Sequence, residues 1–352
     1  MPNSTPEHSQ RDDAEVQLRG LARRLGLHYV TADRLSIRRR RCGRGWCYLN
    51  GDRDRIRDAR TVRRLSRLAV PPAYRDVLYA RDPDAHLQAI GRDAAGRLQY
   101  RYHPHWERAR ELRKGEGLAR LAAALPRIRR RVRRHLANGA LTREFAAAAA
   151  IELMAASAIR PGRESYARQN GTRGAATLLK SNVSVSGGRI SLSFRSKGGK
   201  RIAKELQAPR LAAALARLRQ LPGARLFQYR ADDGTIVKLT ARELTAFLRE
   251  LAGEPVALKD FRTLFACASA LMALARVEPA HSEARRRRQV REAVSAVAED
   301  LANTPAICRR SYVHDTVVAA FETGKLQRLA PKLKAPAGRV EALADIVGKS
   351  RP

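Results

Sequence analysis

Four cationic residues and one tyrosine are the residues of this chain best suited to chemistry. They are Arg160, Lys197, Lys259, Arg262 and Tyr312, and the cations lie at the ends of expected helices or in a loop. Lys259 and Arg262 are three residues apart, so both can point from one face of the first turn of a helix. A phenol, whose pKa is about 10, is a weak nucleophile until cations stabilise its anion. Two arginines match the equatorial oxygens of a phosphorus centre under attack, so this set suits phosphoryl transfer without a metal ion.

Each of these residues taken alone also has an ordinary structural explanation. Arg160 precedes Pro161-Gly162 and could simply place a positive charge at the C-terminus of a helix. Tyr312 is one of nine tyrosines, and a single tyrosine is more often a half-buried core residue. Lys197 shares its glycine-rich loop with Lys200. The residues alone do not decide which lysine of that loop has a function.

The charge balance indicates a polyanionic partner. The 352 residues include 70 Lys and Arg against 34 Asp and Glu, which gives a formal net charge of +36 and a pI of about 11.4. Three basic runs lie at Arg38–Arg41, Arg129–Arg134 and Arg285–Arg288. One such run is usually a solvated face, but three spread along the chain favour a track for nucleic acid. Phosphate contacts of this kind give affinity without reading a base sequence.

Other classes of protein find little support in the sequence. We find no phosphate-binding loop of the P-loop type, no H-E-x-x-H and no G-x-S-x-G motif. The four cysteines have neither the number of a disulfide framework nor the paired spacing of a zinc site, so we expect free, buried thiols and no metal or cofactor. The start lacks the pattern of a secretory signal, and the longest apolar stretch, Thr263–Ala275, is too short to span a bilayer. These features predict a soluble cytoplasmic protein with no membrane partner.

The pattern of apolar residues and turn signals along the chain predicts an α+β protein with two lobes. Residues 1–15 are polar, and Ala14–Leu27 has the apolar spacing of a short helix. Residues 28–104 contain short apolar runs separated by turn signals, which is typical of a small antiparallel sheet, with one helix at Asp58–Leu68. Residues 105–330 have a helical period, and residues 331–352 form a basic, weakly patterned tail.

Specific elements are expected to hold the candidate residues. A helix opens at Thr142 and is apolar almost all round, which predicts a buried central helix. A hairpin follows, with strands at Asn182–Ser186 and Ile190–Phe194 and a loop at Ser196–Lys200. Thr240 and Glu243 form a capping box for the helix that runs to Leu251. Further helices are predicted at Asp260–Arg276, Glu283–Leu301 and Pro305–Gly324, and an earlier helix is expected to break at Pro126.

At these candidate residues the chain resembles the type IB DNA topoisomerases in their compact bacterial and poxvirus-like form. The resemblance covers roughly residues 28–321. It is carried by motifs in the family's order: IRRRRCGRGWCYLN, VPPAYRDV, HLQAIGRDAAGRLQYRYHPHW, AIRPGRESYARQNGT, KDFRT and NTPAICRRSYVH. It implies a β-rich N-terminal DNA-binding domain at 28–104 and a helical catalytic domain at 105–330, like that of tyrosine recombinases, which together clamp duplex DNA as a monomer.

The resemblance also implies roles for individual residues. The catalytic set would be Arg160, Lys197, Arg262, Asn303 and Tyr312, with Tyr312 as nucleophile and the loop lysine as general acid. Asn303 lies nine residues before the tyrosine, where the poxvirus branch has a histidine; unlike histidine, asparagine does not change charge near neutral pH. Candidate DNA contacts are Arg97, Gln99, Tyr100, Tyr102, Arg163, Tyr166 and Lys259. The implied activity is relaxation of positive and negative supercoils through a 3′-phosphotyrosyl intermediate, without ATP or metal, at the bacterial nucleoid.

One departure and two alternatives accompany this interpretation. After KDFRT the family usually continues with Trp and small residues, whereas this chain reads LFACASALMALA, which bears on how the helix of Arg262 is seated. A tyrosine recombinase is one alternative, but it would normally have His-x-x-Arg in place of Lys259 and Arg262, and a helical N-terminal domain. A non-enzymatic architectural DNA-binding protein is the other, and it would form no covalent adduct with DNA.

Overall fold

The computed structural model describes residues 16 and 18–348 and divides the chain into two compact units, residues 1–113 and 114–352. The division falls inside helix α3 (Pro104–Ala137). The expected polar segment 1–15 lies outside the described residues, and residues 18–24 are helical as the apolar spacing predicted. Among the described residues, no helix is both long and apolar enough to cross a membrane.

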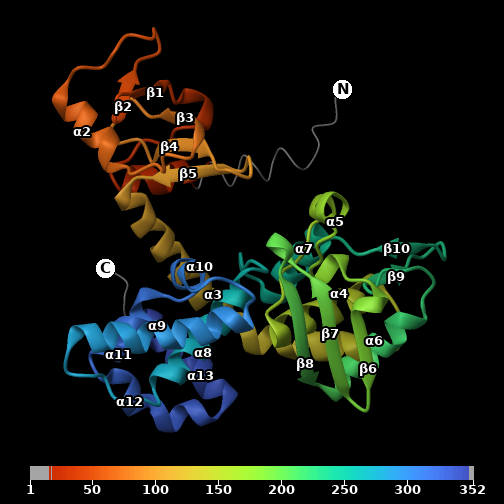
Figure 1. Ribbon diagram of the computed structural model, residues 1–352. Coiled ribbons are helices and arrows are strands. Elements are labelled where there is room, and N and C mark those ends of the chain that lie inside the picture. The colour runs from red at the N-terminus through yellow and green to blue at the C-terminus, as the bar shows by residue number, and fades with distance from the viewer. Residues whose placement is uncertain (1–15, 17, 349–352) are drawn as a thin grey trace. The chain divides into compact units, whose positions relative to one another are not determined.

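The first unit is built on a five-stranded antiparallel sheet, which confirms the predicted β-rich lobe (Figure 1). Its strand order is β2-β1-β3-β4-β5. The elements are η1 (Ala32–Arg34), β1 (Ile37–Cys42), β2 (Gly45–Leu49), α2 (Ala59–Arg67), β3 (Arg75–Tyr79), β4 (Leu87–Arg92) and β5 (Leu98–Tyr102). Apolar side chains from one face of the sheet, including Ile37, Tyr48 and Tyr79, pack with Leu65 of α2. The core of this unit therefore lies between the sheet and α2.

Part of the first basic run is structural. Arg39 on β1 donates hydrogen bonds to the carbonyls of Val70, Pro71 and Tyr74 at 2.7–2.9 Å. Its guanidinium also lies 4.1 Å from the centroid of the Trp46 ring. These contacts tie the first hairpin to the segment after α2, so this arginine stabilises the lobe instead of facing solvent as its neighbours in the run do.

The second unit is mainly helical around one large core, which confirms the predicted α+β class. Its elements after α3 are α4 (Arg143–Ser157), α5 (Glu164–Asn170), η2 (Ala175–Thr177), η3 (Lys180–Asn182), β6 (Val183–Ser186), β7 (Arg189–Arg195), η4 (Lys197–Gly199), β8 (Arg201–Gln207), α6 (Pro209–Gln220), β9 (Gln228–Arg230), β10 (Ile236–Lys238), α7 (Ala241–Ala252), α8 (Asp260–Leu274), α9 (Glu283–Asp300), α10 (Pro305–Ser311), α11 (Asp315–Glu322), α12 (Lys325–Leu329), η5 (Ala330–Lys334) and α13 (Pro336–Gly348). As predicted, α4 is buried along most of its length. It contacts both the sheet and the helices α6, α7 and α8.

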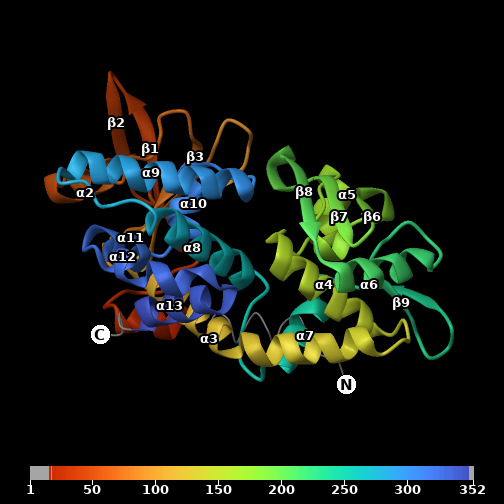
Figure 2. The same cartoon turned by 90° about the horizontal axis from the view of Figure 1, so that it is seen from below.

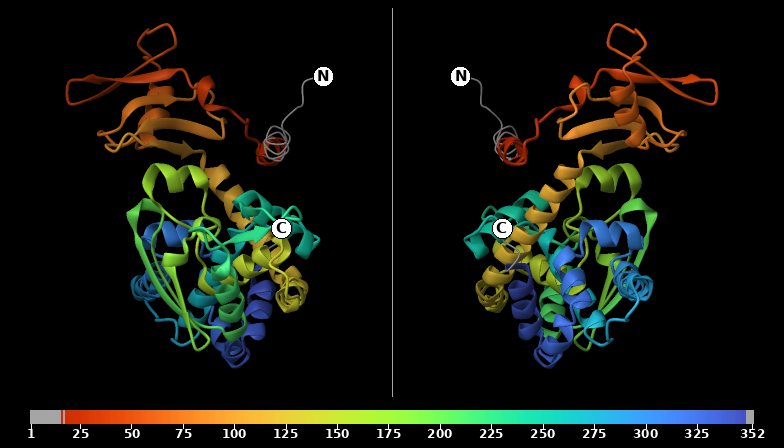
Figure 3. Two further views of the ribbon diagram at one scale, coloured as in Figure 1. Left: turned by 90° about the vertical axis from the view of Figure 1, so that its right-hand side faces the viewer. Right: turned by 90° about the vertical axis from the view of Figure 1, so that its left-hand side faces the viewer.

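The predicted hairpin is present, and it has a third strand that the sequence analysis missed. The strands β6, β7 and β8 form one antiparallel sheet in that order, and Figures 1 and 3 show helices against one of its faces. Along β7 the side chains of Ile190, Leu192 and Phe194 are buried while those between them are more exposed. The predicted loop Ser196–Lys200 therefore becomes the turn between β7 and β8.

Three predictions about helices were wrong. Helix α3 continues through Pro126, because burial of the residues around it, such as Leu125 and Ile128, compensates for the backbone hydrogen bond that proline removes. The single helix predicted over Pro305–Gly324 is two helices, α10 and α11, which are separated at Tyr312. Residues 336–348 form α13 instead of a tail, since Leu343, Ile346 and their neighbours bury an apolar face in the core.

Candidate active site

Arg262 lies buried at the start of helix α8. Arg262 is 3% exposed, and its guanidinium donates hydrogen bonds to the carbonyl of Ala158 and, at 3.0 Å, to the carbonyl of Leu301. The guanidinium carbon is 5.0 Å from the centroid of the Tyr312 ring. Burial lowers the pKa of Arg262, while the neighbouring Tyr312 opposes that change. One arginine thus joins the end of α4, the end of α9 and the tyrosine. The segment LFACASALMAL that follows KDFRT is part of α8 and buries Leu264, Cys267 and Leu271.

Tyr312 occupies the break between α10 and α11, and several backbone contacts hold it there. Its amide donates to the carbonyl of Cys308 at 2.9 Å, and its carbonyl accepts from the Cys267 thiol of α8 at 3.1 Å. Lys114 of α3 donates to the carbonyl of Val313 at 3.0 Å. Figure 2 shows α9 beside α10, and α9 in turn contacts α8. The half-buried phenol therefore comes from a short segment anchored on two longer helices.

The surroundings of Tyr312 favour its ionised form. Burial is the largest single influence on this phenol and raises its pKa, while the positive charges of Arg262 and Arg160 lower it. The side chains of Arg262 and Asn303 also interact with the phenol, and the net effect is a pKa below its ordinary value. A tyrosine with a lowered pKa beside two guanidinium groups has the properties required of a nucleophile.

Arg160 and Asn303 complete this cluster from two other segments. Arg160 follows the C-terminus of α4 and donates to Ser196 Oγ at 3.3 Å and to Asn303 Oδ1 at 3.4 Å. Asn303 follows α9, where its amide donates to the carbonyl of Ala298 at 2.8 Å. The structure therefore brings together Arg160, Arg262, Asn303 and Tyr312, which are four of the five residues expected to be catalytic.

In the part of the chain that the structure describes, two buried donors of the cluster have no acceptor at hydrogen-bonding distance, although both side chains lie near enough to the Tyr312 phenol to lower its pKa. Arg262 Nε and Asn303 Nδ2 are buried, and neither has a hydrogen-bond acceptor among residues 18–348. Buried donors in folded proteins are normally paired, so unpaired ones call for an explanation. Both belong to the residues that surround Tyr312. An anionic ligand at this place would provide the missing acceptors.

A close approach of two glycines sets the segment that carries Arg160. The amide of Ala175 donates to the Arg160 carbonyl at 2.8 Å, and Gly162 has a φ of 81°. A Cβ atom on Gly174 would lie 2.5 Å from the Arg160 carbonyl oxygen and 2.6 Å from Gly162 Cα. A side chain at position 174 would therefore push apart the two backbones that position Arg160.

Lys197 is not in contact with this cluster. It is exposed in η4, the turn between β7 and β8, and no hydrogen bond joins it to the four residues within the described part of the chain. Lys200 is exposed in the same turn. The preceding Ser196 is buried and contacts Arg160, so the base of the turn is attached to the cluster although its tip is not.

The sequence analysis missed Lys204 on β8. Its ammonium donates to the carbonyl of Ser157 at 2.9 Å and lies 5.2 Å from the centroid of the Phe265 ring. Burial lowers the pKa of Lys204, and the charge of Asp300 opposes this. Lys204 and Arg262 thus hold consecutive carbonyls at the end of α4. No motif marks this lysine in the sequence, because its contacts depend on the third strand.

The candidate DNA contacts of the first unit lie on or beside β5. Tyr100 and Tyr102 stack with their ring centroids 6.1 Å apart, which agrees with the prediction that both face one side of a strand. Tyr100 is 47% exposed, whereas Tyr102 is half-buried. Arg97 and Gln99 both donate to Asp93 at 2.9 Å. Tyr100 therefore has the most freely accessible ring of this group.

The candidate contacts of the second unit are also exposed. They are Arg163, Tyr166 and Lys259. Tyr166 lies on α5, which is fixed by two hydrogen bonds of 2.6 and 2.7 Å between the Glu164 carboxylate and Arg225. Arg225 is itself largely buried. The short helix therefore presents its exposed side chains from a rigid base.

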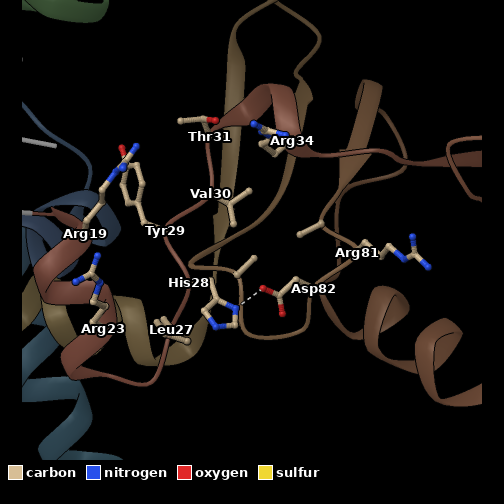
Figure 4. Close-up of a pocket in the computed structure, with 12 residues that line it drawn as sticks. Arg19, Arg23, Leu27, His28, Tyr29, Val30, Thr31, Arg34, Arg81 and Asp82 are labelled. Carbon is tan, nitrogen blue, oxygen red and sulfur yellow. Dashed lines mark hydrogen bonds and ion pairs between the residues drawn. The ribbon is translucent and has the colours of Figure 1, made fainter. Parts of the chain in front are cut away.

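A separate pocket of about 650 Å³ lies within the first unit (Figure 4). Its lining includes Arg19, Arg23 and Tyr29, together with His28 and Asp82, which form an ion pair of 2.6 Å. The hydrogen bond and the charge of Asp82 raise the pKa of His28. None of the five candidate catalytic residues lines this pocket, so it is not the site of the chemistry described above.

Comparison with known proteins relates the whole arrangement to one family. Residues 104–335 match the family described as the catalytic core of eukaryotic DNA topoisomerase I, and residues 45–93 match the N-terminal domain of bacterial DNA topoisomerase IB. DNA topoisomerase 1B of Acanthamoeba polyphaga mimivirus is 28% identical over 293 residues, which cover 81% of this chain and 87% of that protein. The catalytic-core match includes the segments that carry Arg262, Asn303 and Tyr312. A β-rich N-terminal unit, a helical core and these two matches in the corresponding order show that the chain belongs to the type IB DNA topoisomerases.

Proposed function

We propose that this topoisomerase relaxes supercoiled duplex DNA through a transient break in one strand, with Tyr312 as the nucleophile. The phenolic oxygen attacks a backbone phosphorus and forms a 3′-phosphotyrosyl bond, while the bond from phosphorus to the 5′ oxygen breaks. The freed 5′-hydroxyl end rotates about the intact strand and then attacks the phosphotyrosine, which restores the DNA and the phenol. The phosphodiester energy is conserved in the covalent bond, so the cycle needs no ATP.

The observation that carries this proposal is the position of Tyr312 beside the Arg262 guanidinium and within the electrostatic influence of Arg160. Arg262 and Arg160 lower the pKa of the phenol, and the same charges would oppose the negative charge that collects on the phosphoryl oxygens during attack. The unpartnered donors Arg262 Nε and Asn303 Nδ2 would find acceptors in those oxygens. The protein's own cations thus supply the stabilisation that many phosphoryl-transfer enzymes obtain from metal ions.

We also propose that both units contact the duplex and that one copy of the chain is sufficient. The net charge supports this proposal, as does the exposure of Arg97 and Tyr100 in the first unit and of Arg163, Tyr166 and Lys259 in the second. Gln99 and Tyr102, which are half-buried beside Tyr100, would complete the contacts of the first unit. An enzyme of this kind would act on genomic DNA, at the nucleoid in the cytoplasm of a bacterial cell.

The overall proposal is tested by incubating the protein with negatively and with positively supercoiled plasmid in the presence of EDTA and without ATP. We expect relaxation of both substrates at the rate seen without EDTA, because guanidinium groups supply the charge. Quenching with a strong detergent should trap a fraction of the protein covalently on a 3′ end of the DNA. Peptide mapping should then identify Tyr312 as the linked residue. Complete loss of relaxation on removal of divalent ions, or an adduct at a 5′ end, would contradict the proposal.

The choice between Lys197 and Lys200 as general acid can be decided with a modified substrate. The 5′ oxygen is a poor leaving group until it is protonated, whereas a sulfur at the same position leaves readily as a thiolate. We expect Lys197→Ala to slow cleavage of normal DNA by about 10²–10⁴-fold. The same variant should cleave a substrate with a bridging 5′ sulfur at nearly the wild-type rate. Lys200→Ala is the matched control; if its defect is the one that sulfur rescues, the roles are reversed.

Gly174→Ala tests the backbone that positions Arg160. The added Cβ would overlap the Arg160 carbonyl and Gly162, so we expect a loss of about 1–3 kcal/mol in the free energy of unfolding. The rate of DNA cleavage should fall by more than the decrease in folded protein explains, because Arg160 would move away from Asn303. The control is Gly139→Ala, where a Cβ would make an ordinary contact of 3.7 Å with Arg217. Urea unfolding and single-turnover cleavage measure the two effects, and equal behaviour of the variants would refute the positioning role.

A further inference from the structure

The β1–β2 hairpin of the first unit carries two cysteines that the relaxation chemistry does not use. The strand register pairs Arg40 with Cys47 and Cys42 with Gly45. Because side chains alternate between the faces of a strand, Cys42 and Cys47 lie on the same face as diagonal neighbours. The two thiols are therefore close in space as well as in sequence.

The two cysteines differ in their access to solvent. Cys42 is exposed near the end of the hairpin, so the prediction that the thiols are buried was wrong for this residue, whereas Cys47 is 5% exposed. The other two cysteines, Cys267 and Cys308, are fully buried in the core of the second unit. Burial raises the pKa of Cys308 to about 11, which makes that thiol a poor nucleophile. A small oxidant in solution would therefore meet the hairpin pair first.

The charges around Cys47 favour its thiolate. Burial opposes ionisation, but hydrogen bonds from Arg40 and from Cys42, together with the charges of Arg40 and Arg55, lower the pKa of Cys47 below its ordinary value. The thiolate is the reactive form of cysteine towards sulfur, so Cys47 is suited to attack an oxidised neighbour.

We propose that Cys42 and Cys47 are a peroxide-sensitive thiol pair that closes to a disulfide across the β1–β2 hairpin. The exposed Cys42 sulfur attacks one oxygen of hydrogen peroxide, which gives a sulfenic acid and releases one water. The Cys47 sulfur then attacks the Cys42 sulfur, which forms the S–S bond and releases the second water. In total the two thiols lose two electrons and two protons, and one peroxide is reduced to two waters.

The end of the hairpin can make the adjustment that this bond needs. Diagonal neighbours in a sheet have Cα atoms about 7–8 Å apart, whereas a disulfide prefers about 4.4–6.8 Å. Gly43 and Gly45 flank the turn at Arg44, and there is open space where a Cβ would lie on either glycine. Gly43 already has a φ of 58°, a conformation that glycine adopts without strain. The two glycines therefore give the turn freedom to draw Cys42 towards Cys47.

The test uses the full-length protein treated with a few equivalents of hydrogen peroxide. The protein is then unfolded in guanidinium and alkylated, and the labels are counted by mass spectrometry. The reduced chain has four thiols, so closure of one disulfide should leave two labels, on Cys267 and Cys308. Digestion should yield peptides joined through Cys42 and Cys47, and a dithiol reductant should restore four labels.

Variants separate this pair from general oxidation. Cys42→Ser and Cys47→Ser should each form no intramolecular disulfide under the same treatment. Arg40→Gln should slow closure several-fold at neutral pH, because it removes a charge that stabilises the Cys47 thiolate, and Arg38→Gln on the same face of β1 is the matched control. The proposal is overturned if the wild-type protein keeps four alkylated thiols, if Cys42 is oxidised to a sulfinic acid while Cys47 remains alkylated, or if the chains link only to one another. None of these outcomes depends on relaxation activity.

Discussion

Tyr312→Phe is expected to abolish DNA relaxation while DNA binding survives. The substitution removes only the phenolic oxygen, so the ring keeps its place beside Arg262 and its backbone contacts with Cys308 and Cys267. Without a nucleophile no phosphotyrosyl bond can form, and the relaxation rate should fall by at least about 10⁴-fold. On one preparation, plasmid relaxation measures the activity, detergent trapping measures the phosphotyrosyl adduct, and a gel-shift titration measures DNA binding.

The matched control for this variant is Tyr229→Phe. Tyr229 is half-buried in the same unit and donates a hydrogen bond to Glu243 at 3.1 Å. Loss of this hydrogen bond should lower the free energy of unfolding by about 0.5–1.5 kcal/mol and leave the relaxation rate unchanged. Normal relaxation by Tyr312→Phe would mean that another residue is the nucleophile. Loss of DNA binding in parallel with relaxation would mean that the phenol serves in binding.

Arg262→Ala is expected to have the second largest effect, on both catalysis and stability. The variant loses a buried charge beside the reacting phenol, and loss of one such group typically lowers the chemical rate by about 10²–10³-fold. It also leaves the carbonyls of Ala158 and Leu301 without a donor, which should lower the free energy of unfolding by about 1–3 kcal/mol for each carbonyl. Single-turnover cleavage and urea unfolding report the two losses separately, provided that cleavage is measured where the variant is folded.

The pH dependence of cleavage distinguishes an electrostatic role of Arg262 from a merely structural one. Because Arg262 lowers the pKa of Tyr312, its removal should raise that pKa and shift the rising limb of the cleavage rate to higher pH. Arg262→Lys keeps a charge but loses the planar fork, so it should recover part of the shift and little of the rate. Arg230→Ala, which removes a hydrogen bond to the Gly234 carbonyl at 3.0 Å, is the control for an arginine remote from this chemistry. An unshifted pH profile in Arg262→Ala would assign the residue a structural role alone.

The periodicity of the sequence correctly predicted the elements whose apolar residues follow a regular spacing. The β-rich lobe, the buried helix α4, the hairpin β6–β7 and the capped helix α7 were all predicted from local patterns. Such patterns are reliable where one face of an element is buried in a continuous core, since burial then selects the spacing. The predictions failed at Pro126 and at α13, where the core stabilises a helix that local preferences do not favour.

The break at Tyr312 shows a different limit. A continuous helical pattern over Pro305–Gly324 concealed the end of α10, which depends on contacts with Cys267 of α8 and Lys114 of α3. Both partners are distant in sequence, so no window of sequence around the tyrosine contains them. Lys204 could not be recognised for the same reason, because its partner Ser157 at the end of α4 is also distant in sequence.

The types of the reactive residues and the chemistry open to them were determined by the sequence alone, because a phenol, guanidinium groups and a high net charge keep their chemical character in any fold. Their convergence was decided by the tertiary structure. Arg160, Arg262, Asn303 and Tyr312 come from four separate segments, and packing of α4, α8, α9 and α10 around one core brings them together. The lowered pKa of Tyr312 depends on charges from segments remote in the chain, and it therefore exists only in the folded protein.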